Sequence, residues 1–215
     1  IGVFCLMART FAGLGFEGII TLGKYVMCVI VALVVQAFVV YPALLVVFTR
    51  LNPIKFFRRF FSVMLFAFSS STSNATIPLN MEKLSEMGVS RDVSSFTIPL
   101  GATINMDGTS IMQGCAVMFA AQAYGMDLGI SALITVVFTA VMASVGTAGV
   151  PSVGLVTLNM VFSSVGLPVD AIAIIMGIDH ILDMIRTAVN VTGDAICTII
   201  VSFRNNELDR DVFNG

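Results

Sequence analysis

The segment NMDGTS at residues 105–110 places an aspartate and an asparagine inside a strongly apolar stretch of the chain. An ionisable group within a membrane-spanning segment costs roughly 3 kcal/mol on insertion scales, so Asp107 is a candidate functional residue. A break in the helix at Asn105 would also turn backbone carbonyls inward. Carboxylate, amide and carbonyl oxygens are the ligands that hard cations such as Na⁺ prefer. We therefore predict a cation site at Asn105 and Asp107.

Polar side chains recur along one face of the stretch 169–203 if it forms a single α-helix of about 3.6 residues per turn. They are Asp179, Asp183, Arg186, Thr187, Asn190 and Asp194. Asp194 and Asn190, one turn apart, predict a second cation site. The Arg186 guanidinium can hold a carboxylate in bidentate fashion, and Asp183 can accept an ammonium group. Together these two roles fit a zwitterion with a second carboxylate, which means aspartate or glutamate.

The same groups could instead pair with one another, because Asp183 and Arg186 stand three residues apart on the helix. Three carboxylates against one arginine leave negative charge, however, and this favours cationic partners. His180, at the edge of the polar face, has no nearby His or Cys, so we expect a structural role. The four cysteines show no CxxC spacing, and we interpret them as small apolar residues.

The composition predicts helices in a membrane around these groups. Of the 215 residues, 57% are hydrophobic and 11% charged, and the mean hydropathy is +0.99. These values are too apolar for a water-soluble domain, and about 20 apolar residues suffice for one helix to span a bilayer. The chain opens on Ile1 inside an apolar run, without a signal peptide pattern. We expect a fragment of a longer, all-α integral membrane protein.

The placement of lysine and arginine predicts the topology. Basic residues cluster at 50–59, 83–91 and 204–210, whereas the loops 124–129 and 166–170 have none. Because cytoplasmic loops are enriched in Lys and Arg, the first three regions are expected inside and the last two outside. Segments 51–92 and 125–168 then each begin and end on one side, as re-entrant hairpins with polar tips. A transmembrane helix follows each hairpin, which gives an inverted repeat typical of secondary transporters.

The predicted segments can be given in chain order. They are the end of an apolar helix at 1–20, a transmembrane helix at 21–50, the cytoplasmic-side hairpin at 51–92, a transmembrane helix at 93–124 broken at NMDGT, the external hairpin at 125–168, the amphipathic last transmembrane helix at 169–204 and a cytoplasmic tail at 205–215. The hairpin tips offer unpaired N–H groups, which favour an anionic carboxylate. A capping turn without a ligand is the alternative for each tip.

Four ordered strings carry a resemblance to a known family: SSSTSNATIP, PLGATINMDGTS, GTAGVPSVG and ILDMIRTAVNVTGD. With them the chain, from about residue 2, resembles the dicarboxylate/amino acid:cation symporters, which include the glutamate transporters. The resemblance implies a homotrimer in the cell (plasma or inner) membrane, in which a transport domain moves like an elevator against a scaffold. Residues 1–20 would end a scaffold helix, and the external hairpin would be the gate.

The resemblance also implies roles for individual residues. Ser73, Val150 and Gly154 would meet the substrate, Thr109 and Arg186 would hold its side-chain carboxylate, Asp183 its amino group, and Thr187 and Asn190 would complete the pocket. One Na⁺ would lie at Gly101, Asn105, Asn190 and Asp194, and another at the carbonyls of Thr103, Ser144, Val145 and Thr147. Asp107 and Asn105 would belong to a third site, whose other ligands come from an earlier helix outside this chain.

Four positions depart from the family pattern. Ser71 and Met184 stand where some relatives carry an extra arginine, and Ile185 and Ser152 replace glycines common in relatives. These departures bear on substrate preference and transport rate, which the resemblance alone does not give.

The predicted function is sodium-coupled symport of aspartate or glutamate, with no enzymatic activity and no nucleic-acid partner. Proton coupling, or a C4-dicarboxylate or neutral amino acid as substrate, are the alternatives within the family. Asp183 argues against a dicarboxylate, which has no ammonium group. An intramembrane hydrolase would need two opposed aspartates or a Ser–His pair. A passive ion channel would not need a pocket shaped for a zwitterion.

Overall fold

The computed structural model describes residues 20–145, 149–169 and 171–215, and within these ranges it contains helices and no β-strand. The predicted all-α class is confirmed. Residues 1–19, and with them nearly all of the predicted first segment at 1–20, lie outside the described part. By length and composition, one helix among the described residues, Ile20–Thr49, could cross a membrane. It contains a π-helical turn, η1 (Gln36–Val40), continues as α2 (Tyr41–Thr49) and ends at Arg50, which adopts a left-handed conformation.

Eight further helices follow in the described part of the chain. They are α3 (Pro53–Ser70), α4 (Ser73–Glu86), α5 (Arg91–Ile104), α6 (Asp107–Ala123), α7 (Ile130–Ser144), α8 (Val153–Ser164), α9 (Ala171–Arg204) and α10 (Arg210–Asn214). Local sequence sets several of the boundaries. The Asn52 side chain accepts a hydrogen bond from the Ile54 amide at the start of α3, and the Ser90 side chain caps α5 through the Val93 amide.

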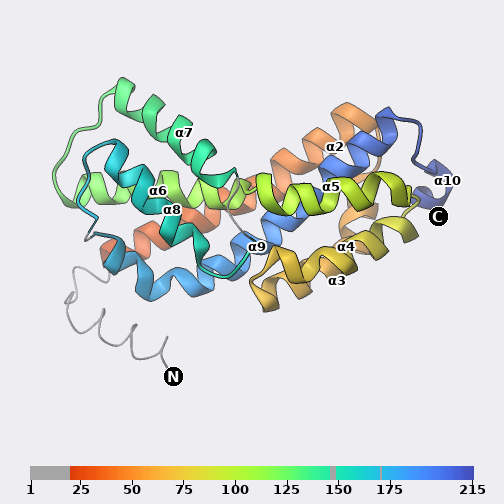
Figure 1. The fold of residues 1–215 in the computed structure, drawn as a ribbon, viewed down its shortest axis with the longest axis horizontal. Coiled ribbons are helices and arrows are strands. Elements are labelled where there is room, and N and C mark those ends of the chain that lie inside the picture. Colours follow the sequence, from red (N-terminus) through yellow and green to blue (C-terminus); the bar gives the residue numbers. More distant parts are fainter. Residues whose placement is uncertain (1–19, 146–148, 170) are drawn as a thin grey trace.

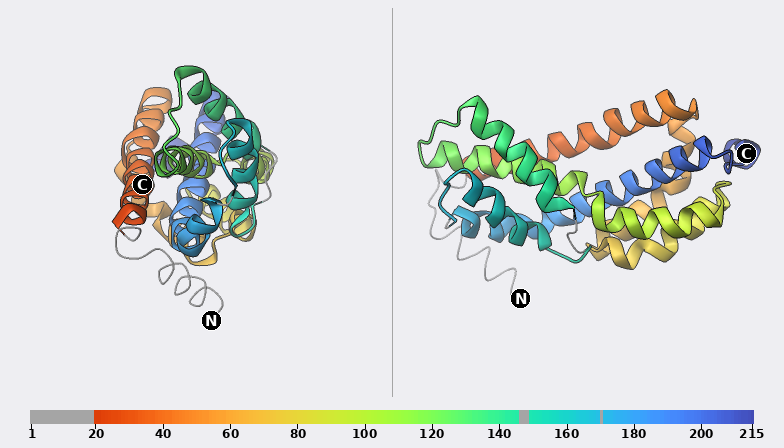
Figure 2. Two further views of the ribbon diagram at one scale, coloured as in Figure 1. Left: turned by 90° about the vertical axis from the view of Figure 1, so that its left-hand side faces the viewer. Right: turned by 45° about the horizontal axis from the view of Figure 1, so that its top comes forward.

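The break at NMDGTS separates two helices that lie end to end. α5 ends at Ile104 and α6 begins at Asp107, so Asn105 and Met106 form the non-helical link. Figure 1 shows α5 and α6 following one another along the long axis, with the link near the middle of the molecule. The right-hand view of Figure 2 shows the turn between α3 and α4 next to the start of α8, also near the middle of the long axis. The helix break and the two hairpin turns therefore converge on one place.

α9 is the central element that the other helices pack against. It contacts α2, α3, α4, α5, α6 and α8 over its 34 residues. Many of its apolar side chains, such as Ile175, Leu182 and Ile196, are buried, and so are most of its polar ones. In lipid there is little hydrophobic drive between helices, so van der Waals packing and hydrogen bonds must hold such a bundle together. A buried polar face on the central helix consequently requires partners from its neighbours.

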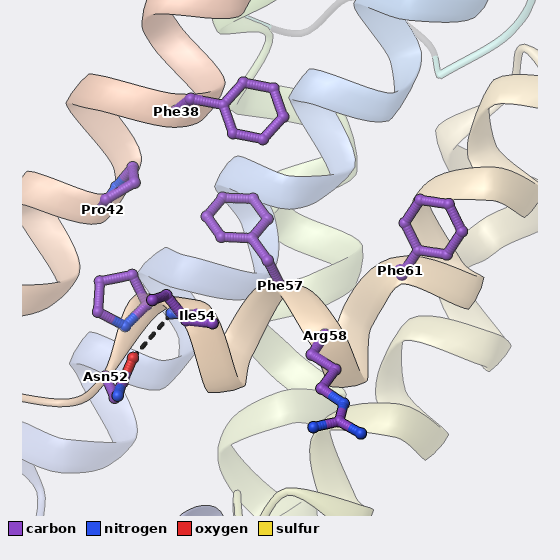
Figure 3. A pocket seen from close by; sticks show the side chains of 8 residues that line it. Phe38, Pro42, Asn52, Ile54, Phe57, Arg58 and Phe61 are labelled. Carbon is purple, nitrogen blue, oxygen red and sulfur yellow. Dashed lines mark hydrogen bonds between the residues drawn. The ribbon is translucent and has the colours of Figure 1, made fainter.

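The outer surface is strongly apolar. Val47, Ile54, Ile130 and Val156, which lie on four different helices, are each more than 70% exposed. Figure 3 shows one example, a groove between the helix Ile20–Thr49 and α3 with phenylalanine rings along its walls. A water-soluble protein rarely exposes so much contiguous apolar surface, whereas a lipid bilayer accepts it. The surface thus agrees with the membrane environment expected from composition.

Candidate functional site

Arg186 is at the centre of a buried charge cluster on α9. Its Nη1 atom lies 3.0 Å from Asp179 Oδ1 and its Nη2 atom 2.5 Å from Asp183 Oδ1. All three residues are at most 5% exposed. One guanidinium thus faces two carboxylates, and the cluster keeps a net charge of −1 when all three groups are ionised. A substrate carboxylate that binds Arg186 has to compete with Asp183 for the Nη2 atom.

Asp179 is the residue whose role sequence reasoning missed. Helical periodicity predicts Asp179 on the polar face of α9 but indicates no function for it. Its spacing of seven residues, two helical turns before Arg186, is the signal that could have shown the contact. Asp179 Oδ1 accepts from Arg186, while its Oδ2 atom is buried and has no hydrogen-bond partner among the described residues. Asp179 is therefore a second carboxylate partner of Arg186, on a different guanidinium nitrogen from Asp183.

The predicted substrate residues other than Arg186 gather around one cavity. It is lined by Ser71, Ser73, Met106, Thr109, Gly149, Val150, Val153, Gly154, Asp183, Thr187 and Asn190. Its volume of about 10 Å³ corresponds to roughly one water molecule. Arg186 borders the start of α8 from the other side, because a Cβ added at Gly154 would lie 3.2 Å from Arg186 Nη2. An amino acid can enter only if one of the surrounding segments moves.

The segment 149–152 closes the cavity on the side of α7 and α8. The Ser152 amide donates to Asp183 Oδ2 over 2.8 Å, and the Gly149 carbonyl accepts from Thr72 Oγ1 at 2.6 Å and from the Asn74 amide at 3.3 Å. These bonds join the turn before α8 to both α9 and the turn between α3 and α4. Ser152 has φ 58°, a left-handed conformation that a residue other than glycine adopts at a cost of roughly 1–2 kcal/mol. The closed arrangement therefore combines strain with polar contacts.

Asp194 has the chemistry of a cation ligand. It is 3% exposed, and its Oδ1 atom accepts from Asn105 Nδ2 at 2.8 Å. No lysine or arginine among the described residues forms an ion pair with it. A Cβ at Gly101 would lie 2.7 Å from Asp194 Oδ1, so the end of α5 approaches the carboxylate closely only because that residue is glycine. A buried, unpaired carboxylate beside the carbonyl end of a helix fits a hard cation such as Na⁺.

Asn190 lies between the cation residues and the substrate cavity. Its Oδ1 atom accepts from the Gly108 amide at 2.7 Å, and its Nδ2 atom is 3.4 Å from Thr109 Oγ1. The structure thus brings Gly101, Asn105 and Asp194 together, while the amide oxygen of Asn190 is engaged with the first turn of α6. Asn190 connects α9 to the residues that follow the helix break.

Asp107 receives two hydrogen bonds from the helix Ile20–Thr49. Gln36 Nε2 and Tyr41 Oη lie 3.0 Å and 2.9 Å from the same atom, Asp107 Oδ2. Sequence reasoning did not connect Gln36 or Tyr41 with the site; an isolated glutamine within an apolar run was the available signal. That further cation ligands come from an earlier helix outside this chain stays a prediction. The two side chains that bond to Asp107 among the described residues lie within this chain.

The remaining predicted cation set is only partly described. Thr147 lies outside the described residues. Ser144 is buried and accepts a hydrogen bond from Ser110 Oγ at 3.2 Å, which joins the end of α7 to α6, and Val145 follows directly. The Thr103 hydroxyl is 2.9 Å from the Pro99 carbonyl of its own helix. A cation site formed by these carbonyls stays a prediction.

Comparison with known proteins gives one family. The model of the sodium:dicarboxylate symporter family matches residues 1–203. The putative sodium-dependent excitatory amino acid transporter glt-4 of Caenorhabditis elegans is 41% identical over 94% of this chain and 41% of its own length. Mouse excitatory amino acid transporter 1 is 39% identical over 100% of this chain and 40% of its own length, and human excitatory amino acid transporter 2 is 36% identical over 97% and 37%. The chain spans about two fifths of the length of these relatives.

Proposed function

Because this chain belongs to the sodium:dicarboxylate symporter family, we propose that the protein containing it carries aspartate or glutamate across the cell membrane together with Na⁺. Similar relatives are named excitatory amino acid transporters, and one of them is named sodium-dependent. The observation that supports this best is the buried Arg186 between two aspartates, next to a cavity lined by hairpin turns and α9. The finer proposal is a multi-pass homotrimer that works by an elevator mechanism.

The charge cluster suggests how an acidic amino acid is recognised. The substrate's side-chain carboxylate replaces Asp183 at Arg186, and the released Asp183 then accepts the substrate ammonium group. Asp179 keeps its bond to Arg186 and so holds the guanidinium in position during the exchange. Arg186 and Asp183 each keep an oppositely charged partner before and after binding, which matters because an unpaired buried charge is strongly unfavourable. A ligand without an ammonium group would leave Asp183 unpaired, and this favours amino acids over dicarboxylates.

Cation coupling is proposed for the residues beside the cavity. Na⁺, when bound, supplies the positive charge that Asp194 lacks in its surroundings. Asn105 contacts Asp194 directly, and Asn190 contacts Thr109, a predicted substrate residue. Occupancy of one site can thus alter the geometry of the other through the break between α5 and α6. The hairpins 51–92 and 125–168 would be re-entrant, and the second would act as the gate.

The experiment that tests the proposed function is uptake of radiolabelled aspartate by the complete protein in liposomes. We expect accumulation when Na⁺ is higher outside than inside, and none when choline replaces Na⁺. Uptake that ignores the sodium gradient but follows a proton gradient would contradict sodium coupling. Ion currents without accumulation would contradict transport, and preference for succinate over aspartate would contradict the role of Asp183.

The contact between the two hairpin turns gives a first prediction. We expect Thr72→Val to loosen the segment 149–152, because it removes the 2.6 Å hydrogen bond from Thr72 Oγ1 to the Gly149 carbonyl. A net hydrogen bond contributes about 1 kcal/mol, so amide hydrogen exchange in this segment should become roughly fivefold faster. Thr135→Val, whose hydroxyl bonds only within its own helix α7, is the matched control. Equal exchange in Thr72→Val and wild type would show that the contact does not hold the segment closed.

A further inference from the structure

Tyr41 presents one hydroxyl to two acceptors on different helices. Its Oη atom lies 2.9 Å from Asp107 Oδ2 on α6 and 3.2 Å from the Val189 carbonyl on α9. The side chain is 1% exposed, so no solvent competes for the proton. A tyrosine hydroxyl has a single proton to donate. Only one of the two acceptors can receive a full hydrogen bond at a time.

The π-helical turn places a second donor beside Tyr41. In a regular α-helix, residues five apart are separated by about 140° around the axis. In the π-helical turn the Tyr41 amide bonds to the Gln36 carbonyl, five residues earlier. The two side chains, which a regular helix would point in different directions, here reach the same oxygen of Asp107. π-Helical turns of this kind occur frequently at functional sites. Because both donors use Oδ2, the Oδ1 atom receives no hydrogen bond from the described residues and is free to face a cation.

The backbone of α9 is shaped to admit the Tyr41 hydroxyl. A Cβ added at Gly193 would lie 2.5 Å from Tyr41 Oη and 2.8 Å from Asn105 Nδ2. Any other residue at this position would push the hydroxyl away or displace the helix. Gly193 directly precedes Asp194, and Asn105 bonds to Asp194. The hydroxyl therefore bonds to Asp107 and lies against the backbone of the residue that precedes Asp194, and both carboxylates are proposed to bind cations.

We propose that Tyr41 is a positioning residue that couples a cation at Asp107 to the substrate-binding part of α9. This inference rests on the proposed function. An ionised carboxylate is a stronger acceptor than a neutral carbonyl, so without a cation the proton points to Asp107. A cation at Oδ1 withdraws charge from the carboxylate, and the proton then turns to the Val189 carbonyl. Val189 directly precedes Asn190, which contacts the Gly108 amide and Thr109 at the substrate cavity.

Gln36 has the complementary task. Its amide keeps a hydrogen bond on Asp107 Oδ2 in both positions of the Tyr41 proton, and this holds Oδ1 in a fixed direction. Partners that orient a ligand in this way typically change metal affinity by about 10- to 100-fold when they are removed. Among the described residues no hydrogen bond joins the Gln36 side chain to Val189, so Gln36 orients the carboxylate without bonding to α9. The two donors can therefore be separated by experiment.

The test measures aspartate binding to the complete purified protein by calorimetry at several Na⁺ concentrations. In wild type, aspartate affinity should rise with Na⁺. We expect Tyr41→Phe to reduce that sodium-dependent gain by about tenfold, which lies within the usual range of coupling between two sites. Gln36→Leu should instead shift the gain to higher Na⁺ concentration and leave its size unchanged. The sodium-induced rise in melting temperature, measured without aspartate, gives a second reading that does not depend on transport.

Tyr25→Phe is the matched control, because Tyr25 lies on the same helix and is also buried, but its hydroxyl has no hydrogen-bond partner among the described residues. An unchanged sodium gain in Tyr41→Phe would overturn the inference. An equal loss in Tyr25→Phe would also overturn it, since the effect would then follow from repacking of the helix. If wild type itself binds aspartate independently of Na⁺, the proposed function fails instead. If Tyr41→Phe also lowers the melting temperature, the Gln36→Leu variant, which keeps Tyr41, shows whether lower stability or the missing Tyr41 hydroxyl reduces the sodium-dependent gain in aspartate affinity.

Discussion

Substitution of Arg186 by cysteine is expected to abolish uptake of aspartate and glutamate. The guanidinium is the only cationic side chain that the described structure places beside the substrate cavity, and it is buried against Asp179 and Asp183. Truncating one partner of a buried charge pair typically costs on the order of 3 kcal/mol, which corresponds to more than about 100-fold in affinity. Sodium-driven uptake of radiolabelled aspartate in liposomes is the measurement. A neutral amino acid such as serine should still be taken up, because Asp183 remains to accept its ammonium group.

The controls must separate recognition from stability, because the variant also leaves two buried carboxylates without their cation. Loss of one member of such a cluster destabilises a protein by roughly 3–5 kcal/mol. Adding Asp179→Asn to Arg186→Cys removes one of the two charges, so the double variant should regain part of the melting temperature. It should not regain aspartate uptake. Recovery of uptake would mean that Arg186 serves only to neutralise its neighbours. Arg58→Cys, an exposed arginine on α3 outside the cavity, should transport like wild type.

The sequence predicted the groups that have chemistry better than it predicted their pairing. The polar face of the last helix, the break at NMDGTS and the membership in the symporter family followed from residue types, helical spacing and ordered motifs. The polar face and the helix break depend on neighbours within a few turns, and each family motif is itself a short run of consecutive residues. Periodicity placed Asp183 and Arg186 on one face, and the structure shows them in contact. Whether that contact is permanent or is exchanged for a substrate depends on energies that spacing does not contain.

The contacts that sequence reasoning missed join residues far apart in the chain. Gln36 and Tyr41 reach Asp107 across 71 and 66 residues, and Thr72 reaches Gly149 across 77. Such pairs depend on how helices pack and on local irregularities such as the π-turn, neither of which hydrophobic periodicity reveals. Glycines give a partial signal. Gly101 and Gly193 both stand where a Cβ would collide with a polar side chain, but a single sequence cannot distinguish such a glycine from one in open space, such as Gly114.

The proposed sodium site makes a second strong prediction, which concerns Asp194. We expect Asp194→Asn to remove the contribution of this site to the effect of Na⁺ on aspartate affinity and on thermal stability, and to leave the contribution of the site proposed at Asp107. The substitution keeps the size of the side chain but removes the charge that is proposed to bind the cation. A ligand present at 100 times its dissociation constant stabilises a protein by about 2.7 kcal/mol, and this contribution should disappear. Thermal unfolding of the complete protein in NaCl and in choline chloride measures it directly.

The same variant should be as stable as wild type, or more stable, when Na⁺ is absent. Without a cation, wild type buries an ionised carboxylate whose one hydrogen bond among the described residues comes from Asn105, and such a charge is costly. Asparagine at this position has no charge to bury and does not attract a cation, so the two salts should differ less in melting temperature than they do for wild type. Asp127→Asn, in the exposed loop before α7, is the control and should keep the full sodium effect. If Na⁺ stabilises Asp194→Asn as strongly as it stabilises wild type, the cation does not bind at Asp194. The negative charge of this residue would then have to be balanced by a proton, which is the coupling ion of the competing hypothesis.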